Sequence, residues 1–271
     1  MRKRTRGYMP GISRIVLKGT ILLVGVGMFM AGCGMPTIGR SSVSTSQEVP
    51  ETTTVLNLTN STAVAVYQFE ETLNDESGNN NTATATGSTS YVIGYRNKSL
   101  NLSNTSNVLN AAYITLPDNL VGKTFTISYW AKVGTWNTTW GALAHMIFKT
   151  SSGSWEGFVS HGANSDTSFY ARNRNDLADN WGDIFATLPT TGEWFHVTET
   201  MDTSGVATLY INGTAVGTYD TAYENFTAAQ VSIMFGQDTW QAQGVVLDDV
   251  VIYDRALSAS EVTQLYNGTL P

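Results

Sequence analysis

Short runs of alternating apolar and polar residues, separated by clusters of turn-forming residues, dominate the chain from residue 62 onward. A period of two places successive side chains on opposite faces of a β-strand. Gly, Asn, Asp, Ser or Thr clusters bound nearly all of the runs, which is the pattern of a β-sandwich or barrel. The runs predict strands at Ala63–Glu70, Tyr113–Leu116, Phe125–Val133, Met146–Lys149, Ser168–Arg172, Trp194–Thr200, Ala207–Asn212, Val231–Phe235 and Val245–Tyr253.

Two local signals define the C-terminal part of this pattern. Asn212-Gly213 between two alternating runs predicts a hairpin, because a type I′ turn needs positive φ at both central positions. Ser258 and Glu261 form a capping box that predicts the start of a short helix with an apolar side. Residues 62–271, a length that suits one large domain, are therefore predicted to form an all-β sandwich with one short C-terminal helix.

The N-terminal segment has the layout of a secretory signal. Residues 1–18 carry six Lys and Arg and no acidic residue, and an apolar run at 21–31 leads to Gly32 and Cys33. A membrane span needs roughly 20 apolar residues, and this run is too short. Met30-Ala31-Gly32-Cys33 resembles a bacterial lipobox, with Met where Leu is usual. The resemblance implies a signal peptide at 1–32, cleavage before Cys33 and lipidation of Cys33 by chains such as palmitate.

Such an anchor predicts a protein of the bacterial cell envelope. Two or three acyl chains on one residue hold a protein at a membrane far more firmly than one chain does. Gly34 stands where the aspartate associated with inner-membrane retention would be, which favours the outer membrane or the cell surface. Cys33 is the chain's only cysteine, so no internal disulfide can form.

Composition supports a tethered, acidic domain. Residues 33–61 include a Ser/Thr-rich stretch with two prolines and no apolar period, which predicts a tether. The whole chain has 15 Lys and Arg against 22 Asp and Glu, and removal of residues 1–32 leaves a net charge of −13. This charge argues against nucleic acid and against an anionic membrane surface as partners.

Several motifs, in order along the domain, resemble those of the laminin-G-like (concanavalin A-like) jelly-roll family. The opening strand ends in Phe69-Glu70 and leads to Asn74-Asp75-Glu76-Ser77-Gly78-Asn79, which looks like the family's DxSGN turn. Phe125–Trp130 resembles the FTISxW strand, and Glu193–Val197 the W-x-HV strand. The final strand, GVVLDDVVIYDRAL, precedes the capped helix. The resemblance implies a two-sheet antiparallel jelly-roll sandwich.

The same resemblance implies a structural calcium site at Asp75 and Asp248. Strand alternation places Val250 and Ile252 toward the core and Asp248 on the same inward side, where a carboxylate needs a partner. In this family the two aspartates meet at one edge of the sandwich and bind calcium, whose ligands are oxygens. The alternative is that Asp75 only caps its turn and Asp248 accepts hydrogen bonds from backbone amides.

Aromatic residues near polar loops are candidate ligand contacts. A sugar ring stacks on an exposed aromatic face, while Asn, Asp and Arg hydrogen-bond to its hydroxyls. The alternative is that these rings cover loop bases and strand edges. The candidates are Trp136, Trp140, Trp155, Arg172, Arg174 and Trp181.

No arrangement typical of an enzyme is found in the sequence. Glycoside hydrolysis needs two carboxylates facing one cleft, and Glu199 and Asp202 are spaced so that they fall on opposite faces of a strand. The three histidines, His145, His161 and His196, are isolated in the sequence. We therefore predict a non-catalytic module that recognises carbohydrate. The alternative is a protein-binding adhesion or structural surface lipoprotein, and a glycan-cleaving enzyme on the same fold is the less favoured reading.

Overall fold

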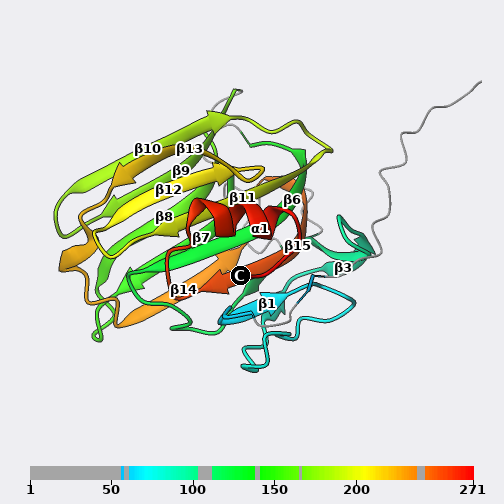
Figure 1. Ribbon diagram of the computed structural model, residues 1–271, viewed down its shortest axis with the longest axis horizontal. Coiled ribbons are helices and arrows are strands. Elements are labelled where there is room, and N and C mark those ends of the chain that lie inside the picture. The colour runs from blue at the N-terminus through cyan, green and yellow to red at the C-terminus, as the bar shows by residue number, and fades with distance from the viewer. Residues whose placement is uncertain (1–55, 58–60, 103–111, 138–140, 165–166, 237–241) are drawn as a thin grey trace, which may run out of the picture. The chain divides into compact units, whose positions relative to one another are not determined.

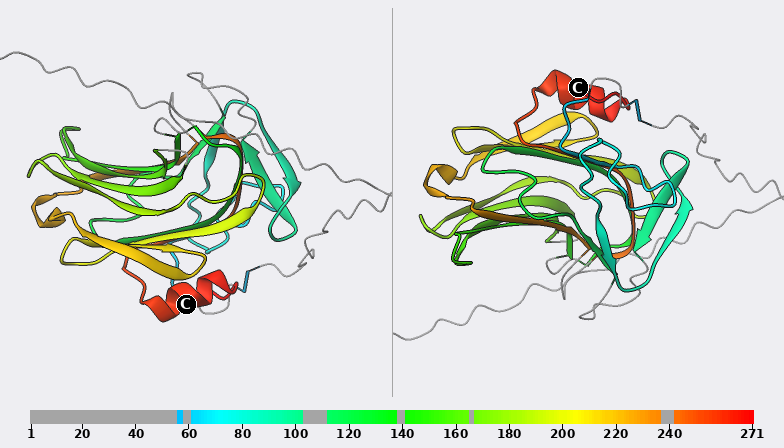
Figure 2. Two further views of the ribbon diagram at one scale, coloured as in Figure 1. Left: turned by 90° about the horizontal axis from the view of Figure 1, so that it is seen from above. Right: turned by 90° about the horizontal axis from the view of Figure 1, so that it is seen from below.

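The computed structural model describes residues 56–57, 61–102, 112–137, 141–164, 167–236 and 242–271. In these residues two antiparallel sheets stack face to face, with one short α-helix outside one of them (Figures 1 and 2). The predicted all-β sandwich with a short C-terminal helix is confirmed. The signal peptide, Cys33 and most of the tether lie outside the described residues.

The eight-stranded sheet runs in the order β13-β12-β11-β6-β15-β4-β3, and β1 also pairs with β15. The opening and closing strands of the domain are therefore hydrogen-bonded neighbours, with Val66 opposite Val251. The strands of this sheet are β1 (Ala65–Tyr67), β3 (Thr89–Ile93), β4 (Lys98–Leu102), β6 (Phe125–Thr135), β11 (Trp194–Met201), β12 (Val206–Ile211), β13 (Thr214–Asp220) and β15 (Gln243–Tyr253).

The seven-stranded sheet runs in the order β10-β9-β8-β7-β14-β5-β2. A 3-10 helix, η1 (Tyr223–Asn225), lies between β13 and β14 in the sequence. The strands of this sheet are β2 (Thr84–Thr86), β5 (Tyr113–Thr115), β7 (Gly141–Lys149), β8 (Trp155–Ala163), β9 (Ser168–Asn175), β10 (Asn180–Thr187) and β14 (Gln230–Phe235).

The main core fills the space between the sheets. It follows the predicted alternation, so that Tyr67 of β1, Tyr129 of β6 and Ile252 of β15 point inward. The predicted hairpin between β12 and β13 is also confirmed, because Asn212 and Gly213 have φ of 50° and 74°. The alternation of residue types therefore indicates which side chains of these strands point toward the core.

A buried polar network crosses this apolar core. The hydroxyl of Tyr129 bonds to Nδ1 of His161 at 2.9 Å, and Nε2 of His161 bonds to Oε2 of Glu199. The second oxygen of Glu199 accepts a 2.8 Å bond from Asn173 Nδ2. His161 is isolated only in the sequence, because β8, β9, β6 and β11 bring these residues together. The network joins the two sheets and is shielded from solvent.

A second apolar cluster covers the outside of the eight-stranded sheet. Helix α1 (Ala259–Tyr266) places Val262 and Leu265 against Val251 and Tyr253 of β15. The predicted capping box is present, since the Ser258 side chain accepts from the Glu261 N–H and the Glu261 carboxylate accepts from the Ser258 N–H. The helix therefore starts where the sequence predicts and buries the side that the sequence predicts.

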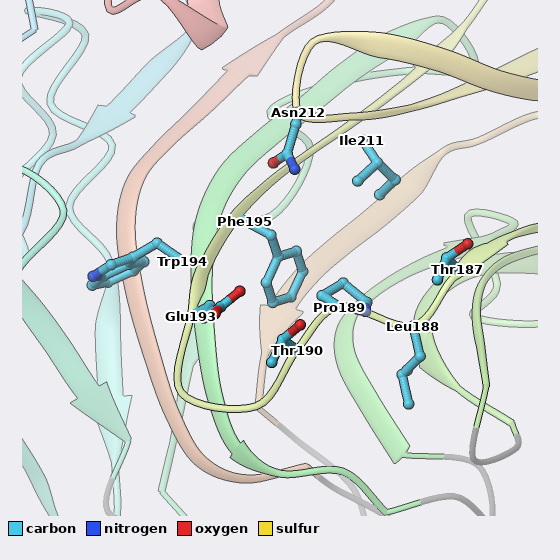
Figure 3. A pocket seen from close by; sticks show the side chains of 9 residues that line it. All are labelled: Thr187, Leu188, Pro189, Thr190, Glu193, Trp194, Phe195, Ile211 and Asn212. Carbon is cyan, nitrogen blue, oxygen red and sulfur yellow. The ribbon is translucent and has the colours of Figure 1, made fainter. Parts of the chain in front are cut away.

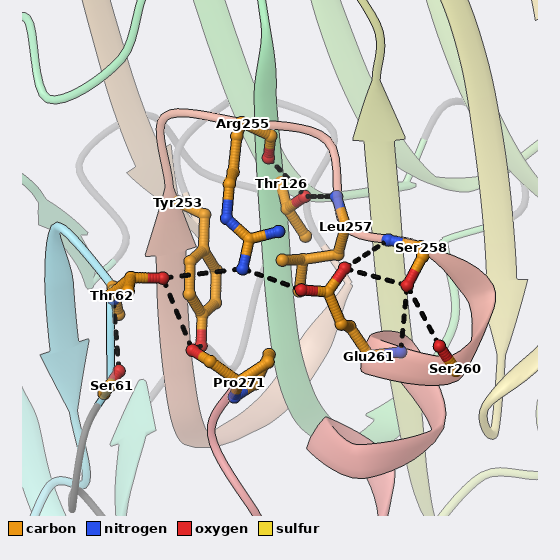
Figure 4. A network of polar contacts seen from close by, with 11 residues as sticks. Ser61, Thr62, Thr126, Tyr253, Arg255, Leu257, Ser258, Ser260, Glu261 and Pro271 are labelled. Atoms are coloured by element: carbon orange, nitrogen blue, oxygen red, sulfur yellow. Dashed lines mark hydrogen bonds and ion pairs between the residues drawn. The ribbon is translucent and has the colours of Figure 1, made fainter.

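Polar contacts fasten the two ends of the domain to this layer (Figure 4). Arg255 Nη2 lies 2.8 Å from Glu261 Oε1 and 3.4 Å from Thr62 Oγ1, and the Thr62 N–H donates to the Pro271 carbonyl at 3.3 Å. Leu56 is buried in the same cluster, and Asn57 forms a bridge with Thr269. The fold thus includes residues 56 and 57, which the sequence analysis placed in the tether.

Candidate functional site

The outer surface of the seven-stranded sheet collects most of the predicted ligand residues. Phe169 and Ala171 of β9 point into the core, so the alternating Tyr170, Arg172 and Arg174 point outward. Figure 2 shows α1 on the far side of the other sheet. We call the outward side chains of β7, β8, β9, β10 and β14 the open face, and the surface of the eight-stranded sheet under α1 the covered face.

Strand register aligns the open face into rows. Residues that pair across neighbouring strands share a face, and one row runs Asp183, Arg172, Ser160, His145 and Met234. The rows on either side begin at Trp181 and Phe185 of β10. Side chains from strands that are distant in the sequence are thus placed next to one another on one surface.

Arg172 is the centre of this arrangement. Its Nε and Nη2 lie 2.7 and 2.6 Å from the two oxygens of Asp183, a two-point ion pair that fixes the guanidinium plane. The guanidinium carbon lies 5.4 Å from the ring centroids of both Tyr170 and Trp181, within cation–π range. Arg172 therefore holds Trp181 in place from one side.

Two large rings of β10 remain exposed beside that pair. Trp181 is 56% exposed and Phe185 is 53% exposed, on the same side of the strand as Asp183. Farther along the open face, Trp155 is 52% exposed and the Lys149 ammonium lies 5.6 Å from its ring. These are rigid apolar surfaces beside hydrogen-bonding groups, which is the usual composition of a ligand site.

The charges beside Trp181 are balanced locally. Arg172 pairs with Asp183, and Arg174 pairs with Asp176 at 2.5 Å. Paired charges leave little net potential to attract an anion or a cation. The arrangement favours an uncharged ligand.

The predicted ligand residues therefore divide into three groups. Trp155, Arg172, Arg174 and Trp181 lie on the open face. Trp140 lies outside the described residues. The prediction for Trp136 needs correction, because its ring is packed among core residues such as Phe169 and is only 9% exposed.

Phe185 is the exposed ring that the sequence analysis missed. The signal was present in the spacing of Trp181, Asp183 and Phe185, which puts all three on one side of a strand. No strand was predicted there, because two large rings of β10, Trp181 and Phe185, face solvent, whereas Gly182 and Ala186 lie on the inward side with Ile184.

The predicted metal residue Asp75 accepts hydrogen bonds from its own turn and from β1. Its Oδ1 accepts from the backbone N–H groups of Val66 and Ser77, each at 2.9 Å. Its Oδ2 accepts from the Ser77 hydroxyl and the Asn81 N–H, again at 2.9 Å. Four donors occupy the roughly four lone-pair sites of a carboxylate.

Asp248 lies on the opposite side of its strand from the one predicted. It pairs with Trp130, which faces away from the core, while Leu247 before it and Val250 after it face inward. The cause is a β-bulge at Asp249, whose φ is 45° and which adds one residue to the alternation.

The surroundings of Asp248 are buried and donor-rich. Its two oxygens accept from the backbone N–H groups of Arg96 and Asp249, each at 2.9 Å. Burial, and then the charge of Asp249, raise the pKa of Asp248, whereas these N–H donors act in the opposite direction. Asp249 pairs with the Arg96 guanidinium at 2.7 Å, so a cation already sits beside the two acids.

These contacts do not fit a calcium ion in this arrangement. The described residues contain no group of three or more His, Cys, Asp or Glu side chains placed to hold a metal. The contacts match the alternative, in which Asp75 caps its turn and Asp248 accepts hydrogen bonds from backbone amides. Calcium binding stays a prediction, which a melting experiment can decide.

The carboxylates considered for catalysis have other partners. Glu199 is buried in the network with His161, and Asp202 Oδ1 accepts from the N–H groups of Ser204 and Val206 in a turn. Glu199 is buried between the sheets and Asp202 lies in the turn between β11 and β12, so neither is on the open face. In the described part of the chain, no helix is long and apolar enough to span a bilayer.

A family model described as the concanavalin A-like lectin/glucanases superfamily matches residues 109–263. No curated protein matches the chain. Among solved structures, domain 4 of an extracellular arabinanase from Geobacillus stearothermophilus, in complex with arabinotriose, is 24% identical with a TM-score of 0.60. The match covers 76% of this chain and 98% of that one.

Two toxin domains are similar in fold. The binding domain of Paraclostridial mosquitocidal protein 1 is 22% identical with a TM-score of 0.60, and the match covers 78% of this chain and 53% of that one. The binding domain of botulinum neurotoxin DC, in complex with rat synaptotagmin II, is 18% identical with a TM-score of 0.56, and 75% and 50% are covered. The chain thus spans about half the length of these toxin domains.

Proposed function

The chain belongs to the concanavalin A-like lectin/glucanase superfamily, and from this premise we propose that it is a non-catalytic module that binds neutral carbohydrate through its open face. The observation that carries the proposal is the placement of Trp181 and Phe185. Both rings are about half exposed on one side of β10, on either side of the Arg172–Asp183 pair. Folding does not require large aromatic rings in solvent, and clustered exposed apolar surface marks interaction sites.

The chemistry of a sugar matches this surface. A pyranose or furanose ring has an apolar side of C–H groups that stacks on an aromatic face, and hydroxyls around its edge. Arg172 and Asp183 supply a donor and an acceptor between the two rings, held by their mutual ion pair. Such pre-ordering reduces the conformational entropy lost on binding. The arabinotriose complex of the similar arabinanase domain supports a carbohydrate ligand.

The proposal places this module at the bacterial envelope. The N-terminal signal and lipobox support cleavage before Cys33 and lipid attachment there, at the outer membrane or the cell surface. Residues 56 and 57 pack on the covered face, the side of the domain that carries α1.

A glycan array tests the proposal. The compact unit Glu48–Pro271 is applied to neutral and acidic glycans, beside Trp181→Ala, Phe185→Ala and the matched control Ile93→Ala. Ile93 is also exposed but lies on β3 of the other sheet. We expect binding to neutral glycans that both aromatic variants weaken about tenfold or more and that the control retains.

Silence of the array would contradict the proposal and favour the protein-binding alternative. The botulinum binding domain, half of which is similar to this chain in fold, was solved in complex with a protein, synaptotagmin. Binding that persists in both aromatic variants would show that the sugar is bound at some other surface.

A further inference from the structure

A pocket of about 260 Å³ opens where β10 ends (Figure 3). It is bordered by the loop from β10 to β11, the start of β11, and the turn between β12 and β13. Figure 3 shows Phe195 and Pro189 at its centre, with Asn212 on one side and Thr190 and Glu193 on the other. The lining residues are Thr187, Leu188, Pro189, Thr190, Glu193, Trp194, Phe195, Ile211 and Asn212.

The pocket borders the C-terminal end of β10. Trp181, Asp183, Phe185 and Thr187 alternate along one side of the strand, and Thr187 is part of the pocket lining. At about 3.4 Å per residue, Thr187 lies about 7 Å beyond Phe185. A chain-like molecule that stacks on Trp181 and Phe185 is therefore directed along β10 toward the rim of the pocket at Thr187.

The polar lining matches the hydroxyls of a sugar. Oδ1 of Asn212 accepts the His196 N–H at 2.8 Å, which fixes the amide and leaves its nitrogen as a donor. Glu193 is exposed and offers carboxylate oxygens as acceptors, and Thr190 offers a hydroxyl. Because Glu193 is an acid, an anionic sugar is repelled.

The remaining lining is apolar and well supported. Phe195 is buried in the core, and Leu188, Pro189 and Ile211 are half-buried around it. The Trp136 indole donates to the Pro189 carbonyl at 2.9 Å, and the Gly192 N–H donates to the Val133 carbonyl at 2.8 Å. Trp136 thus braces the pocket loop from inside.

We propose that this pocket is a chain-end subsite, which takes the terminal neutral sugar of a glycan whose next units lie along β10. Its volume is below the roughly 300–1,000 Å³ of pockets that enclose drug-sized ligands, which suits one sugar unit. The inference rests on the proposed function, since it extends the same binding surface from internal units to the end of the chain.

Titration calorimetry of the full chain in detergent micelles tests the subsite. The probes are arabinopentaose, cellopentaose and laminaripentaose, each also with its terminal primary alcohol oxidised to a carboxylate. The variants are Thr190→Trp, which fills the pocket, Glu193→Gln, which removes its charge, and Trp181→Ala. Ile93→Ala is the control for an exposed apolar residue elsewhere.

For at least one neutral probe, we expect Thr190→Trp to weaken binding about tenfold because the indole fills the pocket. We expect Glu193→Gln to weaken it about tenfold because a charge-assisted hydrogen bond is lost. We also expect Glu193→Gln to reduce the difference in affinity between each neutral probe and its oxidised, anionic form. If Trp181→Ala weakens binding while both pocket variants bind like the wild type, the subsite is refuted and the proposed function stands. If no probe binds, or if Trp181→Ala binds unchanged, the open-face proposal fails and the subsite with it.

Discussion

Each outer surface of the sandwich carries a tryptophan on a strand, but the ring is buried on one surface and exposed on the other. On the covered face, Trp130 lies between Tyr95 and Tyr266, with ring centroids at 3.5 and 5.4 Å, and is buried. On the open face, Trp181 has Arg172 on one side and solvent on the other. Each tryptophan is on a strand and points away from the core.

The difference comes from what lies above each ring. The covered face receives α1 and the segments that enter and leave the domain, and these bury Trp130, His196 and Tyr253. In the described residues, no helix lies on the open face (Figure 2). A ring that no other segment covers is available for a ligand. Whether an outward-facing tryptophan packs in the fold or can contact a ligand therefore depends on the segments that lie over its sheet.

Replacing one tryptophan on each face tests this comparison most strongly. We expect Trp130→Ala to lower the free energy of unfolding by about 3–5 kcal/mol, because it leaves a cavity between two rings. Trp181→Ala should change it by only about 0.5 kcal/mol, since the site is exposed. Urea unfolding of both variants measures this, and equal losses would contradict the distinction between the faces.

Acid should act on the covered face through His196. Burial, and then the charge of Arg96, lower the pKa of His196 from 6.5 to about 3, so the folded protein holds it neutral. As pH falls from 6.5 toward 3, the unfolded chain takes up a proton that the fold excludes. The stabilisation from neutral His196 is therefore fully present above pH 6.5. Between pH 6.5 and 3, the free energy of unfolding falls by about 1.4 kcal/mol per pH unit.

The variant His196→Gln isolates this contribution, because the acidic residues titrate equally in both proteins. We expect the unfolding free energy of the variant to depend less steeply on pH between 6.5 and 3. Parallel curves for the two proteins would show that His196 is not held neutral.

A smaller effect is expected where α1 is fastened. The hydrogen bond from Arg255 lowers the pKa of Glu261 from 4.5 to about 2. The stabilisation is therefore present above pH 4.5 and lost as pH falls toward 2. Since the pair is partly exposed, we expect Glu261→Gln to cost about 1 kcal/mol or less at neutral pH, and little at pH 2. Melting curves at the two pH values measure this, and an equal loss at both would contradict the ion pair as its source.

The smallest effect is expected from chelation. Because the oxygens of Asp75 already accept four hydrogen bonds, we expect EDTA to leave the melting temperature unchanged. A rise with added calcium that disappears in Asp248→Ala would instead establish the ion predicted from the family resemblance.

Local sequence patterns predict the fold correctly where the large apolar residues are the ones that the structure buries. Val250, Ile252, Asn212-Gly213 and the Ser258 cap all behave as their spacing indicates. Asp248 does not, because one bulged residue moves every position before it to the other face. A bulge depends on the backbone and on the neighbouring strand, and the alternation of residue types does not reveal it.

The candidate site was only partly predictable for a related reason. Arg172, Arg174 and Trp181 were found because they cluster in the sequence, whereas the strand that carries Phe185 was missed. Trp136 follows polar and glycine residues, yet it turns inward and supports Pro189. Whether a ring faces solvent depends on contacts with residues that are distant in the sequence.

The bridge between Asn57 and Thr269 has a consequence for how such a module can be combined with others. The first and the last segments of the domain lie side by side, so both points of attachment to a larger protein would be close together. Grafting this sandwich into a hairpin loop of an unrelated scaffold would therefore require the scaffold to part its strands only slightly.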